Sequence, residues 1–440
     1  MSLATAPTAV PSLPPGPRFV PEVAQTLLFG AYRHRLLPAL HRHYGDVYTI
    51  RLAPGHRTLV MLRDPHDIRT VFAGQPDIFH AGEGNLVLMP VMGEHSVLLV
   101  DEDQHRRVRK LLMPAFHGNA LRGYQDMMVE LAEAEVRRWP AGQPFAARSR
   151  MQAVTLEIIL RVVFGVADPG RLAELRPLVR QVAGADTLVM FGWLYPPLLR
   201  FGPWRRYMTV LDRLDKLLYA EIAQRRRAAD LAERTDVLSR LLSTGDGDDG
   251  LTDAELRDQL VTLLLAGHET TATTLAWALH ELAWQPEVRR TAQRAADNDD
   301  EDYLTAVVKE SLRLRPVIYE VVRRLTRPAE VGGYLLPAGT VVAPTIGVVQ
   351  SDPTHYPRPE DFRPERFLDG QPPANTWIPF GGGVRRCLGA GFAQVEAVAV
   401  LREVLTRFDV RPALARPEKP RPRNITLVPS RGARIVVTRR

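Results

Sequence analysis

The spacing of apolar residues predicts one unusually long helix near the middle of the chain. It begins at Thr252, where Thr252 and Glu255 have the spacing of a capping box. No proline follows until Pro286, so the helix can run for about 34 residues, or about 50 Å at 1.5 Å per residue. A helix of that length is expected to cross the whole molecule. Its apolar positions recur every three or four residues or at multiples of that spacing, at Leu256, Leu260, Leu263, Leu264, Leu275, Leu279 and Leu282.

Short segments of alternating polarity predict β-hairpins around a mainly helical body. Most of the remaining chain has helical spacing, so the expected fold class is mainly α with small β-sheets, an α+β arrangement. The three predicted hairpins are residues 47–62 around Pro54–Gly55, residues 332–342 with a turn at Pro337–Gly339, and residues 425–437 with a turn near Ser430–Gly432.

The chain shows no internal boundary after its first residues. Residues 1–18 are rich in proline and are expected to form an irregular leader. No glycine- or serine-rich linker divides the rest, so residues 19–440 are predicted to form one large domain. With 440 residues, of which 45% are apolar, the core is large enough to enclose a bulky cofactor.

Charge and hydropathy narrow the choice of partners. The chain has 57 basic and 50 acidic residues, a formal net charge of +7. Because no long basic run occurs, this excess favours an acidic protein partner over nucleic acid. The sequence has no stretch of about 20 apolar residues and no secretory start. We therefore expect a cytoplasmic protein without a transmembrane anchor.

The single cysteine, Cys387, lies at the end of a glycine-rich loop. One thiol excludes a disulfide within the chain and a multi-cysteine metal cluster. Apolar residues recur at helical spacing after Cys387, so the loop delivers the thiol to a helix N-terminus, where the thiolate is favoured. The glycines allow the backbone to approach a large flat ligand. The loop reads Phe380-Gly381-Gly382-Gly383-Val384-Arg385-Arg386-Cys387-Leu388-Gly389.

This loop resembles the cysteine-ligand loop of the cytochrome P450 family, Phe-Gly-x-Gly-x-Arg-x-Cys-x-Gly, at every fixed position. The resemblance implies a single large P450-type domain with haem b, iron protoporphyrin IX, buried between the long helix and the loop. It also implies that Cys387 is the axial iron ligand, with electron density from the thiolate favouring O–O cleavage. Phe380, Gly381 and Gly389 are expected to lie against the cofactor.

The middle of the long helix carries an unusual polar motif, Ala266-Gly267-His268-Glu269-Thr270-Thr271. A glycine inside a helix costs about 1 kcal/mol relative to alanine, which suggests a special role. The motif resembles the oxygen-binding groove of the P450 family. The resemblance implies that Ala266 and Gly267 contact the cofactor and that Glu269 and Thr270 deliver protons to bound O2. A zinc-protease motif would need a second histidine at the position of Ala272.

Two arginine-containing motifs agree with the same family. Glu310 and Arg313 are one helical turn apart and can pair. They resemble the family's Glu-x-x-Arg motif, whose partner is the arginine of Pro364-Glu365-Arg366-Phe367. The resemblance implies a structural role for Glu310, Arg313 and Arg366.

A second basic group is expected to bind the haem propionates. His105 and Arg109 share one face of a predicted helix, and the resemblance places both on the propionates. Arg385 completes the set with Arg323, although the choice between Arg323 and Arg324 is open. Bidentate pairing of guanidinium with carboxylate suits arginine at such positions. A dinucleotide-binding motif at Gly389-Ala390-Gly391 is excluded because residue 394 is Gln394.

The resemblance implies a haem-thiolate monooxygenase that uses O2, a lipophilic substrate and a separate ferredoxin- or flavodoxin-type electron donor. Two alternatives are a peroxygenase of the same fold that uses hydrogen peroxide and a non-catalytic haem sensor. Neither needs the Glu269–Thr270 pair. We expect a monomer, with residues 188–204 as a peripheral membrane contact. The donor is expected to dock on Arg106, Arg107, Lys110 and Arg386, and the substrate to contact residues 86–92, 188–194, Leu263, Ala266 and 317–321.

Overall fold

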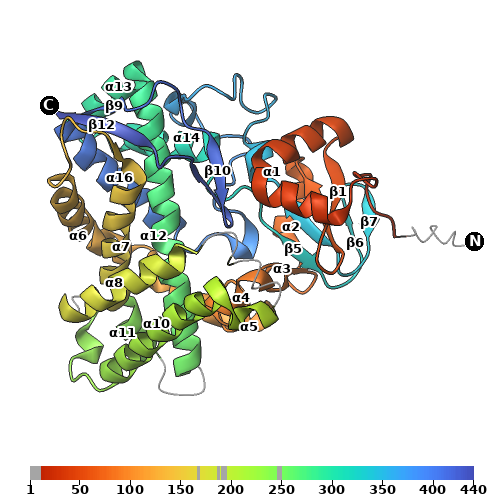
Figure 1. Ribbon diagram of the computed structural model, residues 1–440, viewed down its shortest axis with the longest axis horizontal. Helices are drawn as coiled ribbons and strands as arrows, with labels where there is room; N and C mark the ends of the chain where they lie inside the picture. The colour runs from red at the N-terminus through yellow and green to blue at the C-terminus, as the bar shows by residue number, and fades with distance from the viewer. Residues whose placement is uncertain (1–10, 166–168, 186–188, 190–195, 245–249) are drawn as a thin grey trace, which may run out of the picture.

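A computed structural model describes residues 11–165, 169–185, 189, 196–244 and 250–440. Figure 1 shows most of the helices gathered around α12 (Asp253–Trp284), while α1 (Glu22–Tyr44) and the main sheet form the opposite side of the molecule. The protein is mainly helical with small sheets, as the sequence predicts.

The remaining α-helices are α2 (Pro65–Ala73), α3 (Ala81–Gly84), α4 (Met89–Met92), α5 (Glu102–Leu112), α6 (Asn119–Val136), α7 (Ala147–Phe164), α8 (Pro169–Ala183), α10 (Gly202–Arg226), α11 (Val237–Ser243), α13 (Pro286–Asp297), α14 (Glu301–Leu314), α15 (Ile346–Val349) and α16 (Ala390–Arg407). Short 3-10 helices are η1 (Leu86–Leu88), η2 (Met113–Phe116), η3 (Pro196–Arg200), η4 (Leu231–Glu233), η5 (Pro364–Phe367) and η6 (Gly383–Arg385). The strands are β1 (Val47–Leu52), β2 (Arg57–Leu62), β3 (Phe79–His80), β4 (Phe145–Ala146), β5 (Arg323–Leu325), β6 (Ala329–Val331), β7 (Tyr334–Leu336), β8 (Val341–Pro344), β9 (Phe408–Pro412), β10 (Pro420–Arg423), β11 (Thr426–Pro429) and β12 (Arg434–Arg439).

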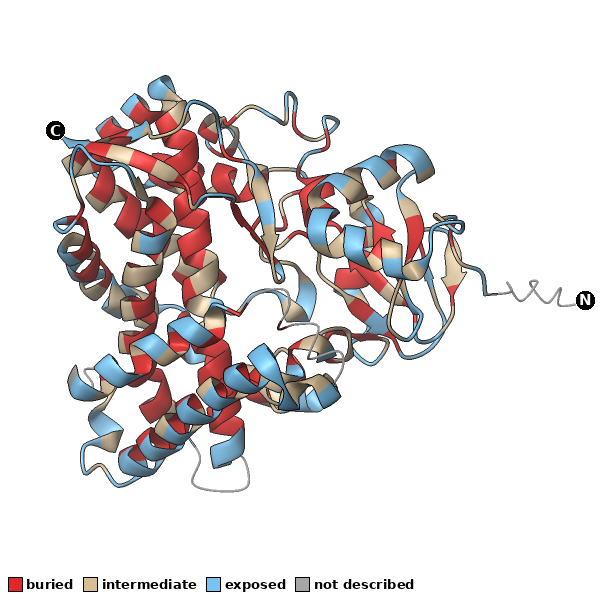
Figure 2. Ribbon diagram, in the orientation of Figure 1, coloured by how far each residue is buried: buried red, intermediate tan, exposed pale blue. Residues whose placement is uncertain are grey.

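The predicted long helix is confirmed as α12, which has 32 residues. Its capping box is complete: Thr252 Oγ1 accepts the Glu255 N–H at 3.2 Å, and Glu255 Oε2 accepts the Thr252 N–H at 2.8 Å. Figure 2 shows α12 buried along most of its length, with a less buried stretch near its middle. Because the helix is buried on most sides, apolar residues occur on all its faces, and several polar residues such as Arg257 and Asp258 are buried with them.

The main sheet has the strand order β1-β2-β8-β5-β3. The predicted hairpin at residues 47–62 is confirmed, because β1 and β2 pair antiparallel from Val47↔Leu62 to Leu52↔Arg57. Alternate residues of β2 enter two different cores, as the period of a strand requires: Val60 and Leu62 pack with α2, and Leu59 and Met61 pack with α1. The sheet is therefore covered by a helix on each face.

The other two hairpin predictions are wrong in their pairing. β7 pairs with β6 through a turn at Gly332 and Gly333, whose φ angles of 61° and 75° suit a tight hairpin turn. Pro337–Gly339 instead leads the chain into β8 of the main sheet. Likewise β11 pairs with β10, while β12 joins β9 and β4 in a separate sheet. Residues 430–432 thus connect two sheets.

The described part of the proline-rich N-terminal segment is attached to the sheet. Residues 11–18 contain no helix or strand. The Thr49 N–H donates to the Pro15 carbonyl at 2.8 Å, and Thr49 Oγ1 donates to the Pro14 carbonyl at 2.9 Å. A side chain at Gly16 would overlap the Thr49 carbonyl, so this contact is close.

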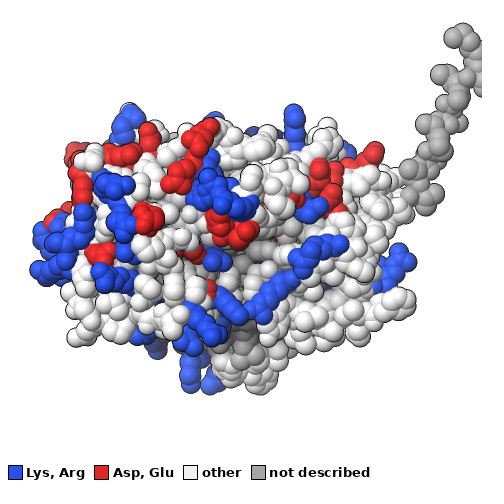
Figure 3. Space-filling view, turned by 90° about the horizontal axis from the view of Figure 1, so that it is seen from above, with Lys and Arg blue, Asp and Glu red and all other residues white. Residues whose placement is uncertain are grey.

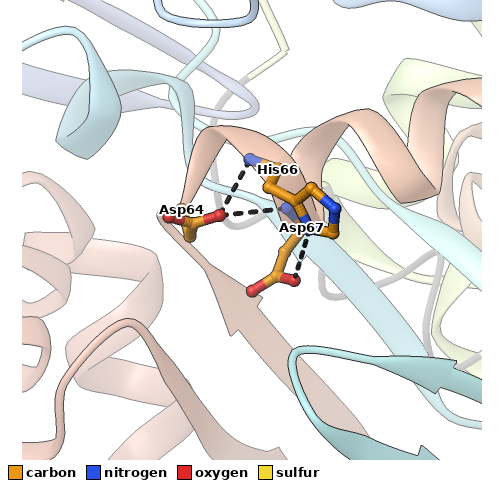
Figure 4. Close-up of side chains that lie close together, drawn as sticks. All are labelled: Asp64, His66 and Asp67. Carbon is orange, nitrogen blue, oxygen red and sulfur yellow. Dashed lines mark hydrogen bonds and ion pairs between the residues drawn. The ribbon is translucent and has the colours of Figure 1, made fainter.

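Asp64 caps the N-terminus of α2, as Figure 4 shows. One Asp64 carboxylate oxygen accepts the backbone N–H groups of His66 at 2.8 Å and Asp67 at 3.2 Å. Ligand atoms of these three side chains lie within 4.8 Å of one another, but the arrangement is explained by helix capping. The cap fixes the start of α2, which supports the cysteine loop.

Candidate functional site

Cys387 is exposed, and its thiol can be reached from one side. The protein atoms packed around the rest of the thiol raise its pKa above the usual value by desolvation. The backbone of Gly389 and the charges of Arg109 and Arg386 act in the opposite direction and favour the thiolate. Cys387 lies between η6 and α16, and its own N–H donates to the Phe380 carbonyl at 2.9 Å. The thiol is thus held at the predicted helix N-terminus.

The glycines of the loop are required by its packing on α2. Gly383 has a φ of 65°, and a side chain there would overlap the Phe72 carbonyl. A side chain at Gly382 would meet the Phe72 ring at 2.3 Å. Gly381 also has a positive φ of 65°. The sequence prediction explained these glycines by the approach of a ligand, whereas helix α2 accounts for two of them.

Four predicted basic residues meet near this loop. His105 is buried on α5, and burial together with Arg385 and Arg109 lowers its pKa to about 4. Burial also lowers the pKa values of Arg323 and Arg385 to about 10, while Asp101 acts in the opposite direction on both. Of the neighbouring residues Arg323 and Arg324, Arg323 belongs to this group, as their contacts show.

Arg323 and Arg324 point in different directions. Arg323 is only 6% exposed and lies over the Phe72 ring, 5.8 Å from its centre. Arg324 is 45% exposed and binds Glu83 at 3.0 Å. Arg323 is therefore the member of the basic group, and Arg324 is a surface residue.

The predicted motif on α12 coincides with the less buried part of the helix. Leu265, Ala266, Gly267, Glu269 and Thr270 are not fully buried, and Ala266 is exposed. Of the residues that flank this stretch, those before Leu265 and after Thr270 are buried. Accessible side chains in the middle of a central helix indicate that it faces a space inside the protein.

Thr270 differs from its neighbours in exposure and not in hydrogen bonding. Its hydroxyl donates to the Ala266 carbonyl at 2.8 Å, one turn earlier. Thr271, Thr273 and Thr274 make the same kind of bond but are buried. Among these four threonines, Thr270 is thus the one whose hydroxyl can be reached.

Glu269 is directed toward α7. It forms an ion pair with Arg148, accepts from Gln152 Nε2 at 2.5 Å, and lies 3.9 Å from Arg423. Gly267 also lies close to α7, since a side chain there would meet the Ile159 side chain at 2.9 Å. The glycine predicted to contact a cofactor thus lies at a close contact between α12 and α7.

The Glu310–Arg313 pair is buried and bidentate. Arg313 donates to the two Glu310 oxygens at 2.7 and 2.8 Å, and neither side chain is exposed. Arg366 Nε adds a bond to Glu310 at 3.3 Å. Arg313 also donates to the carbonyls of Gln350 and Asp361, both at 3.1 Å. The three predicted structural residues therefore hold α14 to the chain that leads into the cysteine loop.

Only some residues of the predicted substrate wall are exposed. Leu86 and Met89 are exposed, whereas Leu263 is in the core. Residues 186–188 and 190–195 lie outside the described residues, which removes most of the second predicted segment. In the predicted membrane-contact stretch, Phe201 is exposed but Trp204 packs against the core.

Two charged residues of the predicted contact segments form pairs within the fold. Glu320, in the predicted wall segment 317–321, is 13% exposed and lies 3.7 Å from the buried Arg33. Arg107, expected on a docking face, pairs with Glu255 of α12 at 2.7 Å. In both cases the partner lies far away in the sequence.

A family model described as Cytochrome P450 matches residues 14–437 of the chain. The chain belongs to the cytochrome P450 family. Family membership makes it a haem-thiolate monooxygenase in general terms, with haem iron as its cofactor. Membership of this family accounts for the joint occurrence of one exposed cysteine, a group of basic residues beside it and a less buried polar stretch on the central helix α12.

Curated relatives share this assignment. The chain is 49% identical over 430 residues to a Mycobacterium tuberculosis protein named as a cytochrome P450 135A1, covering 97% of this chain and 96% of that one. It is 45% identical over 439 residues to a Mycobacterium bovis protein named as a cytochrome P450 135B1, covering 98% and 92%. Both names place the proteins in the family and specify no reaction.

Solved P450 structures confirm the fold. The chain is similar to the retinoic acid-bound cyanobacterial CYP120A1, with a TM-score of 0.87 and 23% identity, over 98% of this chain and all of that one. It is also similar to the haem domain of cytochrome P450DA, with a TM-score of 0.84 and 23% identity, over 97% and 98%. No helix among the described residues is long and apolar enough to cross a membrane.

The residues present in this P450 fit a haem. Arg109, Arg323 and Arg385 bring three guanidinium groups to one place, and the acid beside them is Asp101. This excess of buried positive charge suits two further carboxylates, and a haem carries two propionates. Cys387, which is exposed, is the residue that would hold the iron.

Sequence reasoning missed two acids beside this site. Glu396 is 1% exposed on α16, near Thr271, and burial raises its pKa well above the usual value. Its carboxylate oxygens have no hydrogen bond of normal geometry. The spacing of nine residues from Cys387 on an apolar helix was a signal for a buried acid. Asp101, the second, lies in the acidic run Asp101-Glu102-Asp103, where the sequence does not distinguish it from its exposed neighbours.

Proposed function

We propose that this P450 inserts one oxygen atom of O2 into a lipophilic small molecule and releases the other as water. Electrons come from a separate ferredoxin- or flavodoxin-type protein. The observation that carries the proposal is the exposed Cys387 together with Thr270 and Glu269 on the less buried stretch of α12, where Thr270 is partly exposed and Glu269 is held toward α7. A peroxygenase or a haem sensor has no use for that pair.

The residues around the cofactor site have separate roles in the proposed reaction. Haem b, when bound through Cys387, supplies the activation of O2. His105, Arg109, Arg323 and Arg385 hold the propionates. The Thr270 hydroxyl orients a proton donor toward the reacting oxygen, and Glu269 supplies protons from the α7 side. Because Arg148 and Gln152 hold Glu269, a proton reaches Thr270 through rotation of Glu269 or through a water molecule.

The substrate is recognised by apolar surface. The accessible side chains of the expected walls include Leu86, Met89 and Ala266, which offer no charge to a ligand. Binding then rests on burial of apolar area, at about 25 cal/mol per Å2. A steroid, terpenoid, fatty acyl or macrolide-like compound meets this requirement, while a sugar or nucleotide does not. Methionine at the wall adapts to ligands of different shape.

The electron donor binds a basic surface near the cysteine loop. Lys110 and Arg386 are exposed, and Arg106 is 75% exposed beside Asp103. Arg107 is excluded from this surface by its bond to Glu255. On the face seen in Figure 3, basic and acidic side chains are interspersed. We expect the small basic surface formed by Arg106, Lys110 and Arg386 to steer an acidic donor by its local charge.

Turnover of the purified holoprotein tests the proposal. With a surrogate ferredoxin system, NADPH and O2, we expect product from a lipophilic substrate and little product from hydrogen peroxide alone. Product with peroxide only would assign the protein to the peroxygenases. A lipid and terpenoid library screened for displacement of the axial water identifies the substrate. If only hydrophilic compounds shift the spin state, the lipophilic substrate class is wrong.

A further inference from the structure

Asp101 connects two segments that approach the site from different directions. Its carboxylate accepts three backbone N–H groups, from Ala81, Gly82 and Glu83, each at 3.0 Å. These residues form α3 and lead directly into the predicted substrate wall, residues 86–92 (Figure 1). The approach is close, because a side chain at Gly82 would meet the Leu99 carbonyl at 2.1 Å and Asp101 at 2.7 Å.

The same carboxylate binds Arg385, two residues before Cys387. Arg385 Nη2 forms an ion pair with Asp101, and both side chains are nearly buried. Arg385 also donates to the Val100 carbonyl at 2.7 Å and the Val97 carbonyl at 3.2 Å. Three of its five N–H groups are thus used on this side. The other two remain to bind a second carboxylate, such as a propionate.

We propose that Asp101 is a positioning residue that holds Arg385 and couples the substrate-wall segment to the electronic environment of the haem. The proposal rests on the function proposed above, since it takes Arg385 as a propionate ligand. Asp101 and the propionate would share the charge of one guanidinium through different N–H groups, so the position of Asp101 sets how much positive charge the haem experiences. A ligand that displaces residues 86–92 also displaces α3, which precedes them. Because Asp101 binds α3, the displacement changes the hydrogen bond between Asp101 and Arg385.

The geometry makes the coupling specific to Asp101. The next two acids, Glu102 and Asp103, are exposed, with Asp103 88% exposed and paired only with Arg106. Asp101 by contrast is 12% exposed and pairs with Arg385, which lies 284 positions later in the sequence. Charge at this position therefore acts on Arg385 in an environment that water screens weakly.

Asp101→Asn in the haem-loaded protein tests the proposal, with Asp103→Asn as the matched control. An amide can replace one carboxylate oxygen only as a donor, so at least one of the three backbone bonds is lost. Hydrogen exchange at residues 81–83 should become roughly tenfold faster or more, as expected for a lost charge-assisted bond. The haem reduction potential should rise, because a negative charge near the haem is removed. Asp103→Asn should change neither quantity.

A second pair of measurements separates coupling from simple structural support. Addition of a ligand that shifts the spin state should change the potential less in Asp101→Asn than in the unchanged protein. Asp101→Glu keeps the charge but displaces it, so exchange should quicken with a smaller rise in potential; this variant also serves if Asp101→Asn does not fold.

Faster exchange with an unchanged potential would show that Asp101 only supports α3, and it would overturn the proposal. Equal behaviour of the Asp101 and Asp103 variants would do the same. Failure of the proposed function is distinguishable, because it would remove the thiolate signature of the unchanged protein and leave the exchange result intact.

Discussion

Arg148 of α7 and Glu269 of α12 form an ion pair in which each side chain is only 12% exposed. The pair fixes the acid of the central motif on the side of α7, away from the exposed hydroxyl of Thr270. It also contributes to the interface between the two helices, where Thr155 donates to the His268 carbonyl at 3.0 Å. The acid is therefore part of the helix packing as well as of the site.

Arg148→Gln should lower the free energy of unfolding by about 2 kcal/mol, between the values for exposed and fully buried pairs. The reason is that Glu269 keeps only Gln152 and the more distant Arg423. Urea unfolding measures the loss. Arg176→Gln removes a more exposed pair with Glu157 and should cost less than about 1 kcal/mol. Equal losses would contradict this reading of the α7–α12 interface.

Cys387→Ser should abolish the strongly red-shifted absorption band that thiolate ligation gives to the reduced, carbon monoxide-bound protein. The chain has no second cysteine to replace the ligand. Absorption spectroscopy decides the matter, with the unchanged protein as the reference. Retention of the band by the serine variant would invalidate the assignment of Cys387 and the function built on it.

Thr270→Ala should leave haem and substrate binding intact but lower the product formed per NADPH, by about tenfold if proton delivery is mistimed. The electrons then appear as hydrogen peroxide, which is measured directly. Thr273→Ala is the matched control, because its hydroxyl makes the same kind of backbone bond at 2.8 Å and is buried. Similar coupling in both variants would assign Thr270 a helix-bonding role alone.

Glu396→Gln should stabilise the protein progressively as the pH rises above the unfolded pKa of about 4.3. Burial raises the pKa of Glu396 in the folded protein, so the folded state retains a proton that the unfolded state releases. The stability of the unchanged protein therefore falls by up to about 1.4 kcal/mol per pH unit relative to the variant. Unfolding measured between pH 4 and pH 8 tests this. A difference independent of pH would mean that Glu396 is ionised when folded.

Lys110→Glu should slow reduction by an acidic donor severalfold at low salt, and the effect should shrink as ionic strength rises. Lys419→Glu makes the same change at another exposed position and should have a smaller effect. Stopped-flow reduction provides the rates. A rate that does not depend on salt would argue against electrostatic docking without affecting the haem chemistry.

Features encoded locally were predictable from the sequence. The capping box at Thr252 and Glu255 fixes the start of α12 within four residues of chain, and Glu310 and Arg313 pair across one turn. Both depend on neighbours along the chain and on standard helix geometry. The loop before Cys387 is equally compact, which is why its motif identified the family.

Features that depend on distant partners were not predictable. β11 and β12 both alternate, and nothing near Gly432 shows that they enter different sheets. Nothing near Glu320 in the sequence indicates that Arg33, nearly 290 residues earlier, lies beside it. The same holds for Arg107 and Glu255. In each case the deciding contact is created by the tertiary fold.

The single thiol of this chain also offers a way to measure how much of the protein contains its cofactor. Because Cys387 is the only cysteine and its side chain is accessible, a thiol-reactive dye can attach at one position per molecule. Iron ligation would shield that sulfur, so the fraction of molecules that resist labelling counts those with the cofactor in place. A single mass-spectrometric measurement of the labelled fraction would then give the fraction of molecules that contain the cofactor, independently of absorption spectroscopy.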